Sequence, residues 1–382
     1  MSDADSSDLL RVGEREGSEE YTFRTRDGLL STDEIRSAPI ALLDYVAVQP
    51  DDDILVVDGN YGMLGVILAD LAPNGETVIT ETSARAAETC CKNADRNGIE
   101  NLTVELTADI SSIRDGFDLA VYAPKPFSPV DVVNERMAEA GTRLSPGGKF
   151  YISGAKSDGI TRYSDILSDL FTDANRLGIV EACHVYCGTK SEAFQRKQYL
   201  EEHEFRASVG DYTCRFLTVP GLFSWESLDE GTKALLENVT VPSEARVLDC
   251  CCGYGAIGAF VGARTDCKLW ATDDDVVATT YARRNLERNG VSPEAVVTGD
   301  GTDAVATDTF DVVLSNPPTH AGQGVTKKLF SGIHEVLAKD GAAYFVANEI
   351  MNYEEKLSRD FEFAASVKAE AGKYNVICAK PE

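Results

Sequence analysis

Short apolar runs alternate with stretches of helical periodicity along most of the chain. Residues 54–58, 245–249 and 310–314 are runs of mainly aliphatic and β-branched side chains, which is typical of strands buried on both faces of a parallel sheet. Residues 40–46 and 233–239 instead place apolar side chains at helical spacing, as an amphipathic helix does. This alternation predicts an α/β protein with doubly wound sheets.

The whole order of elements occurs twice. The matched segments are 23–31 with 216–224, 40–46 with 233–239, Asp58 with Asp249, Asn97 with Asn289, and Asp118 with Asp311. The last three pairs are separated by 191, 192 and 193 residues (249 − 58, 289 − 97 and 311 − 118), so the separation hardly drifts. A repeat this long indicates a duplicated domain rather than a solenoid.

The duplication predicts two tandem Rossmann-like domains. Residues 1–20 are polar, acidic and rich in serine, and we expect them to be a flexible tail. The first domain then spans residues 21–205 and the second residues 206–382. The charged stretch 190–210 contains the boundary between them.

The amino-acid composition gives the chain an unusually large negative charge. Among 382 residues, 36 Lys and Arg stand against 63 Asp and Glu, which gives a net charge of −27. Such a charge argues against a polyanionic partner, because nucleic-acid binding depends on cationic contacts to phosphate. The acids are scattered along the chain, however, as in the acidic cytoplasmic proteins of salt-loving microbes. The charge therefore does not exclude an RNA substrate.

The ten cysteines show no CxxC pair. Cys183 and Cys187 stand four apart, without a second pair or a suitable histidine close by, so a zinc site is not expected. Adjacent cysteines in apolar runs are typical of small buried residues in a reducing cytoplasm. The sequence has no signal peptide or apolar run of membrane length. We expect a cytoplasmic protein without metal or membrane attachment.

Candidate chemistry follows the run 310–314. Asn316-Pro317-Pro318 must end that strand, because proline supplies no N–H and fixes φ. Asn316 is therefore expected at the carboxyl edge of the sheet, where α/β proteins bind ligands. An ordinary Asn-Pro turn is the structural alternative.

A glycine turn upstream favours the functional interpretation. Asp249 ends a predicted strand, and Gly253, Gly255 and Gly258 follow it. These glycines allow a tight turn into a helix and a close approach of the backbone to a ligand. By itself this pattern would suit a dinucleotide equally well.

Two further acids end predicted strands. Asp273 follows the run 269–272, and its carboxylate suits a ribose diol, because it can accept a hydrogen bond from both hydroxyls. The alternative role for Asp273 is a helix N-cap within residues 273–275. Asp300 lies in the turn 298–301 and could accept from an adenine amino group, or it could be a solvated turn acid.

Together these motifs resemble those of class I S-adenosylmethionine-dependent methyltransferases that act on amino nitrogens. Further matching segments are 220–224, 228–232, His320-Ala321-Gly322 and 345–348. With them the chain is similar, over nearly everything after residue 20, to the RsmC-like group of tandem-domain 16S rRNA guanine-N2 methyltransferases. The resemblance implies S-adenosylmethionine as cofactor, ribosomal RNA or the small-subunit particle as partner, and a degenerate first domain. We expect a monomer.

The resemblance also implies roles for the residues around Asn316. Its side-chain oxygen and the Pro317 carbonyl would accept from the guanine amine and turn the nitrogen lone pair toward the methyl group. Pro318 completes the motif. The family usually has an aromatic residue where this chain has Thr319, and a glycine is common at the position of Cys251. His320 could stack on the base or bond to it, or it could be a turn histidine.

The first copy departs from the second at these positions. We match Gly62-Met63-Leu64 with Gly253-Tyr254-Gly255, and Ala123-Pro124-Lys125 with Asn316-Pro317-Pro318. Alanine has no amide to donate or accept a hydrogen bond. The first domain is therefore predicted to be a non-catalytic scaffold.

Three other functions are compatible with parts of the pattern. Another amino-methyltransferase, acting on adenine N6 or a protein glutamine, would share the Asn-Pro-Pro motif, but Thr319 and the duplication count against it. A non-catalytic RNA-binding module for ribosome assembly would not need an intact Asn316. A nicotinamide dehydrogenase would share the fold but has no use for the two prolines.

Overall fold

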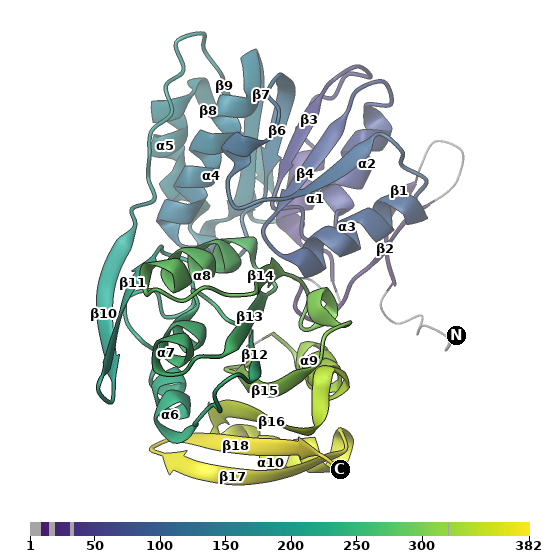
Figure 1. The fold of residues 1–382 in the computed structure, drawn as a ribbon. Helices are drawn as coiled ribbons and strands as arrows, with labels where there is room; N and C mark the ends of the chain where they lie inside the picture. The colour runs from purple at the N-terminus through teal and green to yellow at the C-terminus, as the bar shows by residue number, and fades with distance from the viewer. Residues whose placement is uncertain (1–8, 15–19, 31–33, 320) are drawn as a thin grey trace. The chain divides into compact units, whose positions relative to one another are not determined.

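The computed structural model describes residues 9–14, 20–30, 34–319 and 321–382. It divides into two compact units, Met1–Glu201 and Glu202–Glu382. Each unit is built around its own seven-stranded sheet (Figure 1).

The elements of the first unit are β1 Leu9–Glu14, β2 Glu20–Arg24, α1 Ser37–Leu43, β3 Ile54–Val57, α2 Met63–Leu71, β4 Thr77–Glu81, α3 Ala84–Arg96, β5 Leu102–Leu106, η2 Ile110–Ser112, β6 Phe117–Tyr122, α4 Val130–Arg143, β7 Leu144–Ala155, η3 Lys156–Asp158, η4 Ile160–Arg162, α5 Tyr163–Leu170, β8 Thr172–Val180 and β9 Cys183–Thr189.

Those of the second unit are β10 His203–Val209, β11 Tyr212–Thr218, α6 Glu230–Asn238, β12 Arg246–Cys250, α7 Ala256–Arg264, β13 Lys268–Asp273, α8 Val276–Arg288, β14 Ala295–Thr298, η5 Asp303–Val305, β15 Phe310–Ser315, α9 Gln323–Val336, β16 Leu337–Asn348, η6 Glu349–Met351, α10 Tyr353–Asp360, β17 Phe363–Ala371 and β18 Tyr374–Pro381.

The two sheets have the same topology. The strand orders are β5-β4-β3-β6-β7-β9-β8 and β14-β13-β12-β15-β16-β18-β17. In the second sheet β12, β13, β14, β15 and β16 pair in parallel, and β18 pairs antiparallel with both β16 and β17. The strand order reverses beside β12, which makes the carboxyl ends of β12 and β15 the topological switch point of this sheet. The α/β fold predicted from the sequence is confirmed for both units.

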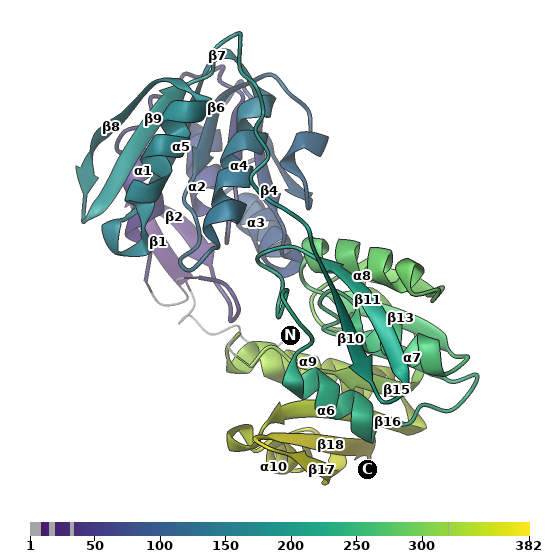
Figure 2. The same cartoon turned by 90° about the vertical axis from the view of Figure 1, so that its left-hand side faces the viewer.

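Helices cover both faces of each sheet (Figures 1 and 2). In the second unit, apolar residues of α9 and α10 form one core with the sheet, including Phe330, Phe345 and Leu357. The helices α7 and α8 lie on the other face, and the hairpin β10–β11 packs against them. Because both faces are covered, the central strands consist almost entirely of buried residues, as their apolar runs predicted.

The start of the chain differs from the prediction. Residues 1–20 were expected to be a flexible tail, but residues 9–14 form β1, which pairs antiparallel with β2. Leu10 packs against a core cluster that contains the buried Tyr21 and Phe23, and this burial compensates the ordering of the strand. Residues 1–8 and 15–19 lie outside the described residues.

The boundary between the domains also needs adjustment. A division between residues 205 and 206 would cut β10, every residue of which pairs with β11. The compact units divide between Glu201 and Glu202 instead, so the whole hairpin belongs to the second unit.

A hydrogen bond that recurs beside the paired strands fixes how the two copies correspond. The N–H of Asp53 donates to Asp118 Oδ2, and the N–H of Arg246 donates to Asp311 Oδ2, so equivalent residues of these strands are 193 positions apart (246 − 53 and 311 − 118). The predicted match of Asp58 with Asp249 is therefore wrong by two residues, and the equivalent of Asp249 is Val56 (249 − 193).

The backbone of the glycine turn supports this correspondence. Gly62 and Gly255, which are 193 apart, both have left-handed φ, 87° and 84°, and both directly precede a helix. Gly253 therefore matches Asn60, which has a φ of 60°, and Leu64 does not stand in place of Gly255. In the first copy, Val56 takes the place of Asp249 and Asn60 that of Gly253, while Gly62 keeps the glycine of Gly255.

The cysteines are free thiols, and most are buried. Among the described residues, no cluster of three or more His, Cys, Asp or Glu could hold a metal ion. No helix in the described part of the chain is long and apolar enough to cross a membrane.

Candidate active site

The predicted site residues of the second unit gather at the carboxyl edge of its sheet. Asp249 and Asp273 are the last or next-to-last residues of the neighbouring strands β12 and β13. Asn316 directly follows β15, the other neighbour of β12. Asp300 comes two residues after β14, at the far side of β13. Parallel pairing of four strands thus brings residues distant in sequence to one edge.

The three glycines of the turn differ in how much space a side chain would have. A Cβ at Gly255 would lie 2.9 Å from the Cα of Ala282, so only glycine allows α7 and α8 to pack this closely. A Cβ at Gly253 would meet nothing within 4 Å, so this position faces open space. Gly258 lies inside α7, where a Cβ would stand 3.1 Å from the side chains of Leu269 and Leu286.

Asp249 is completely buried. Its Oδ2 accepts a 2.9 Å hydrogen bond from the backbone N–H of Gly258, which anchors the first turn of α7 to the end of β12. No described residue bonds to its Oδ1, although that atom is also buried. Burial raises the pKa of the Asp249 carboxyl to about 7, and the nearby Asp273 carboxylate acts in the same direction.

Asp273 holds the turn from the next strand. Its Oδ2 accepts from the N–H of Gly253 at 2.9 Å, and its Oδ1 accepts from the N–H of Asp275 at 3.0 Å. The N-cap of α8 is Asp275, which accepts from Val277 N, so Asp273 does not have the capping role. A carboxylate can accept about four hydrogen bonds, which leaves capacity for a ligand.

Asp300 is buried and paired. Its Oδ2 lies 2.7 Å from the Nζ of Lys328 in α9, and the same ammonium contacts Asp303 at 2.6 Å. Asp300 is thus not a solvated turn acid. One of its oxygens already has a cationic partner, and any ligand at this position must bind beside that ion pair.

Asn316 is half-buried and held through its amide nitrogen. Nδ2 donates to Asp229 Oδ2 at 3.0 Å and to Thr232 Oγ1 at 2.9 Å. A carboxylate can only accept, which fixes the amide nitrogen on this side. Both amide hydrogens are then engaged, and Oδ1 is the acceptor directed away from Asp229 and Thr232.

The residues after Asn316 form a turn. Pro317 is buried, Pro318 is exposed and Thr319 is half-buried. The N–H of Ala321 donates to the Pro318 carbonyl at 3.3 Å. His320 lies outside the described residues.

Sequence reasoning did not single out Asp229 and Thr232 as site residues. They lie in the segment 228–232, which carried only the family resemblance, and Asp229 is the N-cap of α6, accepting from Thr232 N at 2.7 Å. The available signal was Asp-x-x-Thr at a helix start, which has a sufficient local explanation in capping.

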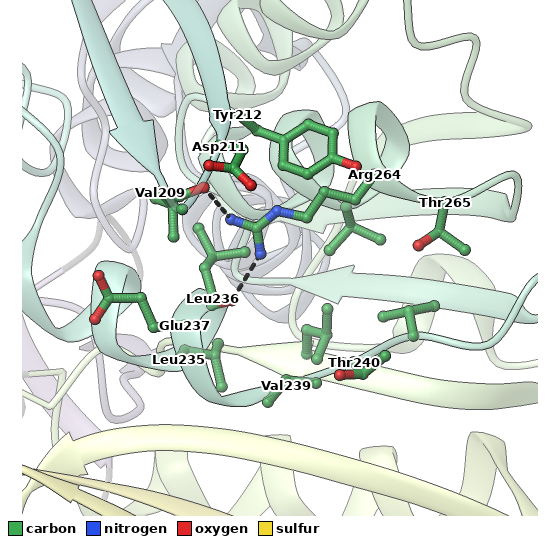
Figure 3. A pocket seen from close by; sticks show the side chains of 14 residues that line it. Val209, Asp211, Tyr212, Leu235, Leu236, Glu237, Val239, Thr240, Arg264 and Thr265 are labelled. Atoms are coloured by element: carbon green, nitrogen blue, oxygen red, sulfur yellow. Dashed lines mark hydrogen bonds between the residues drawn. The ribbon is translucent and has the colours of Figure 1, made fainter.

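One cavity of the second unit lies away from these residues. It has a volume of about 510 Å³ and lies between the hairpin β10–β11 and the ends of α6 and α7. Figure 3 shows Arg264 reaching across it, donating to the carbonyls of Leu236 at 2.7 Å and Val209 at 2.9 Å. None of the predicted site residues lines it.

The edge residues offer hydrogen-bond acceptors to the hydroxyls and amines of a ligand. Open space at Gly253, an unpartnered buried oxygen on Asp249 and spare acceptor capacity on Asp273 surround the same turn. Hydroxyls and amines are the groups that such acceptors bind. The Asn316 oxygen adds an uncharged acceptor at the neighbouring strand.

Comparisons with known proteins identify the family of the chain. The family model "Methyltransferase small domain" matches residues 20–186 and 213–378. "Ribosomal RNA small subunit methyltransferase C" of Pseudoalteromonas atlantica is 27% identical over 275 residues, covering 69% of this chain and 77% of that protein. The protein of the same name from Pseudomonas fluorescens is 30% identical over 273 residues, covering 69% and 79%.

A solved structure shows the same fold over the full length. The T. thermophilus 16S rRNA N2 methyltransferase (RsmC), in complex with AdoMet and guanosine, superposes with a TM-score of 0.80. It is 22% identical, and the match covers 98% of each chain. The tandem arrangement of two α/β units is therefore shared with that protein.

Proposed function

The chain belongs to the methyltransferase small domain family, and we propose that its second unit methylates the exocyclic N2 of a guanine in 16S ribosomal RNA, with S-adenosylmethionine as methyl donor. The observation that carries this proposal is the Asn316 amide, held by its nitrogen so that its oxygen remains for a ligand. The names of the relatives support the choice of 16S rRNA as substrate.

S-adenosylmethionine would bind along the glycine turn and supply an electrophilic methyl group. Asp273 would accept hydrogen bonds from the ribose hydroxyls of the cofactor. The open space at Gly253 would allow the cofactor to lie close to the backbone of the turn. Asp249 has one buried oxygen, Oδ1, without a hydrogen-bond partner, while its Oδ2 holds the helix that follows the turn. Asp300 is proposed for the adenine amino group, in which case it would bind that group beside Lys328.

The protein's part in the transfer is to position the amine. The guanine amine is a poor nucleophile, because its lone pair is delocalised into the ring. Hydrogen bonds from both N–H groups to Asn316 Oδ1 and the Pro317 carbonyl would make the nitrogen pyramidal and direct its lone pair at the methyl carbon. Pro318 limits the conformations of this turn. Oriented dipoles rather than a strong base would then provide most of the catalysis.

The target base must be unpaired or leave its stack, which costs a few kcal/mol. Thr319 and His320 follow the two prolines and are proposed to lie near the base. A threonine gives a flipped base less stacking area than an aromatic ring. Other contacts in the RNA complex would have to hold the base.

The first unit is proposed to be a non-catalytic scaffold. Glu81 takes the place of Asp273, since Thr77 pairs with Ile54 as Leu269 pairs with Val247. It accepts from Asn60 N at 2.5 Å, just as Asp273 accepts from Gly253 N, but the Lys125 ammonium also reaches it at 3.1 Å. An internal cation thus occupies the place where, in the second unit, a ligand hydroxyl is proposed to bind.

The rest of the corresponding region in the first unit is also filled. The cavity lined by Arg36, Asp58, Asn60 and Ala123 has a volume of about 20 Å³, roughly one water molecule. This supports a single cofactor site per chain, in the second unit. We propose that the protein acts as a cytoplasmic monomer.

The test is the methylation state of 16S rRNA in cells. A deletion strain should lack one N2-methylguanosine by mass spectrometry, and a plasmid carrying the wild-type gene should restore it. A plasmid carrying Asn316→Ala should not restore it. An unchanged set of methylguanosines in the deletion strain would contradict the proposed function.

A further inference from the structure

We infer that Asp229 and Thr232 are positioning residues that orient and polarise the Asn316 amide. These three residues are called the amide clamp below. The inference rests on the proposed function, because it assigns a purpose to the amide that the methyl transfer would use.

The geometry of the clamp is specific. Asp229 and Asn316 are 87 residues apart in sequence, and the clamp joins the start of α6 to the end of β15. Asp229 Oδ2 accepts from both Thr232 N at 2.7 Å and Asn316 Nδ2 at 3.0 Å, while Thr232 Oγ1 accepts the second amide hydrogen at 2.9 Å. Thr232 is buried, so little solvent can compete for its hydroxyl.

The clamp would act on the amide oxygen in two ways. It excludes the flipped amide, in which the nitrogen would face the substrate amine as a second donor. It also draws electron density toward Oδ1, because a carboxylate that accepts from the amide N–H strengthens that amide as an acceptor. Both effects favour hydrogen bonding to an amine.

The first unit provides an internal comparison. Its residues equivalent to Asp229, Thr232 and Asn316 are Arg36, Pro39 and Ala123, each 193 positions earlier. None of the three replacements can take part in an amide clamp. The helix α1 nevertheless forms at the position of α6, without a side-chain hydrogen bond at its N-cap. The fold therefore does not require the clamp, which is absent where the amide is absent.

Arg36 of the first unit also occupies the carbonyl that corresponds to the proposed acceptor in the second unit. Its guanidinium donates at 2.7 Å to the carbonyl of Pro124, the residue equivalent to Pro317 (317 − 193). The carbonyl proposed to accept the substrate amine in the second unit is thus occupied by a cation in the first. The copy that loses the clamp loses both acceptors for an amine, which indicates that the clamp and the acceptors serve one function.

Two variants separate this role from helix capping. Asp229→Ser retains a good N-cap but is too short to reach Asn316, and Thr232→Val retains the shape of the side chain but removes the hydroxyl. Thr232→Ser is the matched control, because it keeps the hydroxyl. Each is measured in the full-length protein by steady-state methylation of 16S rRNA, cofactor binding and thermal unfolding.

We expect Asp229→Ser and Thr232→Val to lower kcat by about 10- to 100-fold, less than the loss of the dipole itself. The KM for RNA, the Kd for S-adenosylmethionine and the Tm should change little, and Thr232→Ser should restore most of the rate. In an Asn316→Ala background, Asp229→Ser should cause no further loss, because the group it positions is gone.

Wild-type kcat in both variants, with Asn316→Ala much slower than wild type, would overturn the clamp and leave the proposed function standing. A further loss of rate on adding Asp229→Ser to Asn316→Ala would also overturn it, since Asp229 would then act by another route. Absence of methylation by the wild-type protein would contradict the proposed function instead.

Discussion

Asp249 carries a carboxyl group that the fold buries completely, with one hydrogen bond from the Gly258 backbone. Its folded-state pKa of about 7 lies well above the value of about 3.9 expected in an unfolded chain. The folded state therefore binds the proton more tightly. The resulting stabilisation is fully present below about pH 4 and is lost as the pH rises through 7.

The matched variant for this effect is Asp249→Asn, which keeps an oxygen for the Gly258 N–H and cannot titrate. Relative to this variant, the free energy of unfolding of the wild-type protein should fall by roughly 2–4 kcal/mol between pH 4 and pH 8. Denaturant titrations across this range give the difference. A difference that stays constant with pH would contradict the raised pKa.

Two glycines of the same turn should respond differently to alanine. Gly255→Ala puts a Cβ 2.9 Å from the Ala282 backbone, at a φ of 84°, and should lower the Tm strongly. Gly253→Ala meets nothing within 4 Å, and Asn60 shows that a side chain tolerates this φ.

Gly253→Ala should therefore cost about 1–2 kcal/mol of stability while its methyl group obstructs the proposed cofactor site. Calorimetry should show weakened S-adenosylmethionine binding by a folded protein. Unchanged cofactor affinity in Gly253→Ala would remove this face of the turn from the binding site.

At the residue scale, the sequence predicted that Asp249, Asp273 and Asn316 would lie at one edge of the sheet, but it did not predict the amide clamp. Asp249, Asp273 and Asn316 each follow an apolar run that marks a buried strand, so their common edge could be inferred. The contact of Asn316 with Asp229 depends on how α6 packs on the sheet, where it contacts β16 and β18. No local pattern encodes that contact, and helix capping already explained Asp229.

At the scale of elements, alternation of strands and helices was sufficient to predict both sheets. The alignment of the glycine turn between the two copies could not be predicted from the amino-acid sequence alone. Left-handed φ values occur at the non-glycine residues Asp58, Asn60 and Cys251, which a search for matching glycines cannot find. The hairpin β1–β2 was missed because residues 1–20 are dominated by polar side chains, and the strand depends on tertiary contacts of Leu10.

The ion pair of the first unit gives a prediction at this scale. Glu81, at the end of β4, has a completely buried side chain, and its cationic partner is Lys125 in the loop after β6. Lys125→Met should lower the free energy of unfolding by about 2–4 kcal/mol, because a buried carboxylate loses its counter-charge. Adding Glu81→Gln should recover much of the loss, since the amide oxygen still accepts from Asn60 N.

Urea unfolding of the two single variants and the double variant completes this cycle. Additive effects of the two substitutions would mean that Lys125 and Glu81 are not coupled.

At the scale of the whole molecule, a net charge of −27 is spread along the chain. Like charges repel each other more strongly in the compact state, and salt screens this repulsion, with a Debye length near 10 Å at 0.1 M and 3 Å at 1 M. Raising KCl from 0.1 to 1 M should therefore increase the Tm, as differential scanning calorimetry can show. A Tm that falls with salt would contradict this account.

The duplication also shapes the whole molecule. The two copies share strand order and turn geometry, while the second combines Asp249, Asp229 and Asn316 and the first replaces all three with Val56, Arg36 and Ala123. We therefore propose that chemistry is confined to the second unit.

The most direct test is methyl transfer by the purified full-length protein in high salt. With S-adenosylmethionine and 16S rRNA or the small-subunit particle, the wild-type protein should produce N2-methylguanosine. Asn316→Ala should bind the cofactor normally and be slower by ~10²–10³-fold. Asn316→Ala turnover equal to wild type would show that the turn after β15 is structural and that the proposed mechanism is wrong.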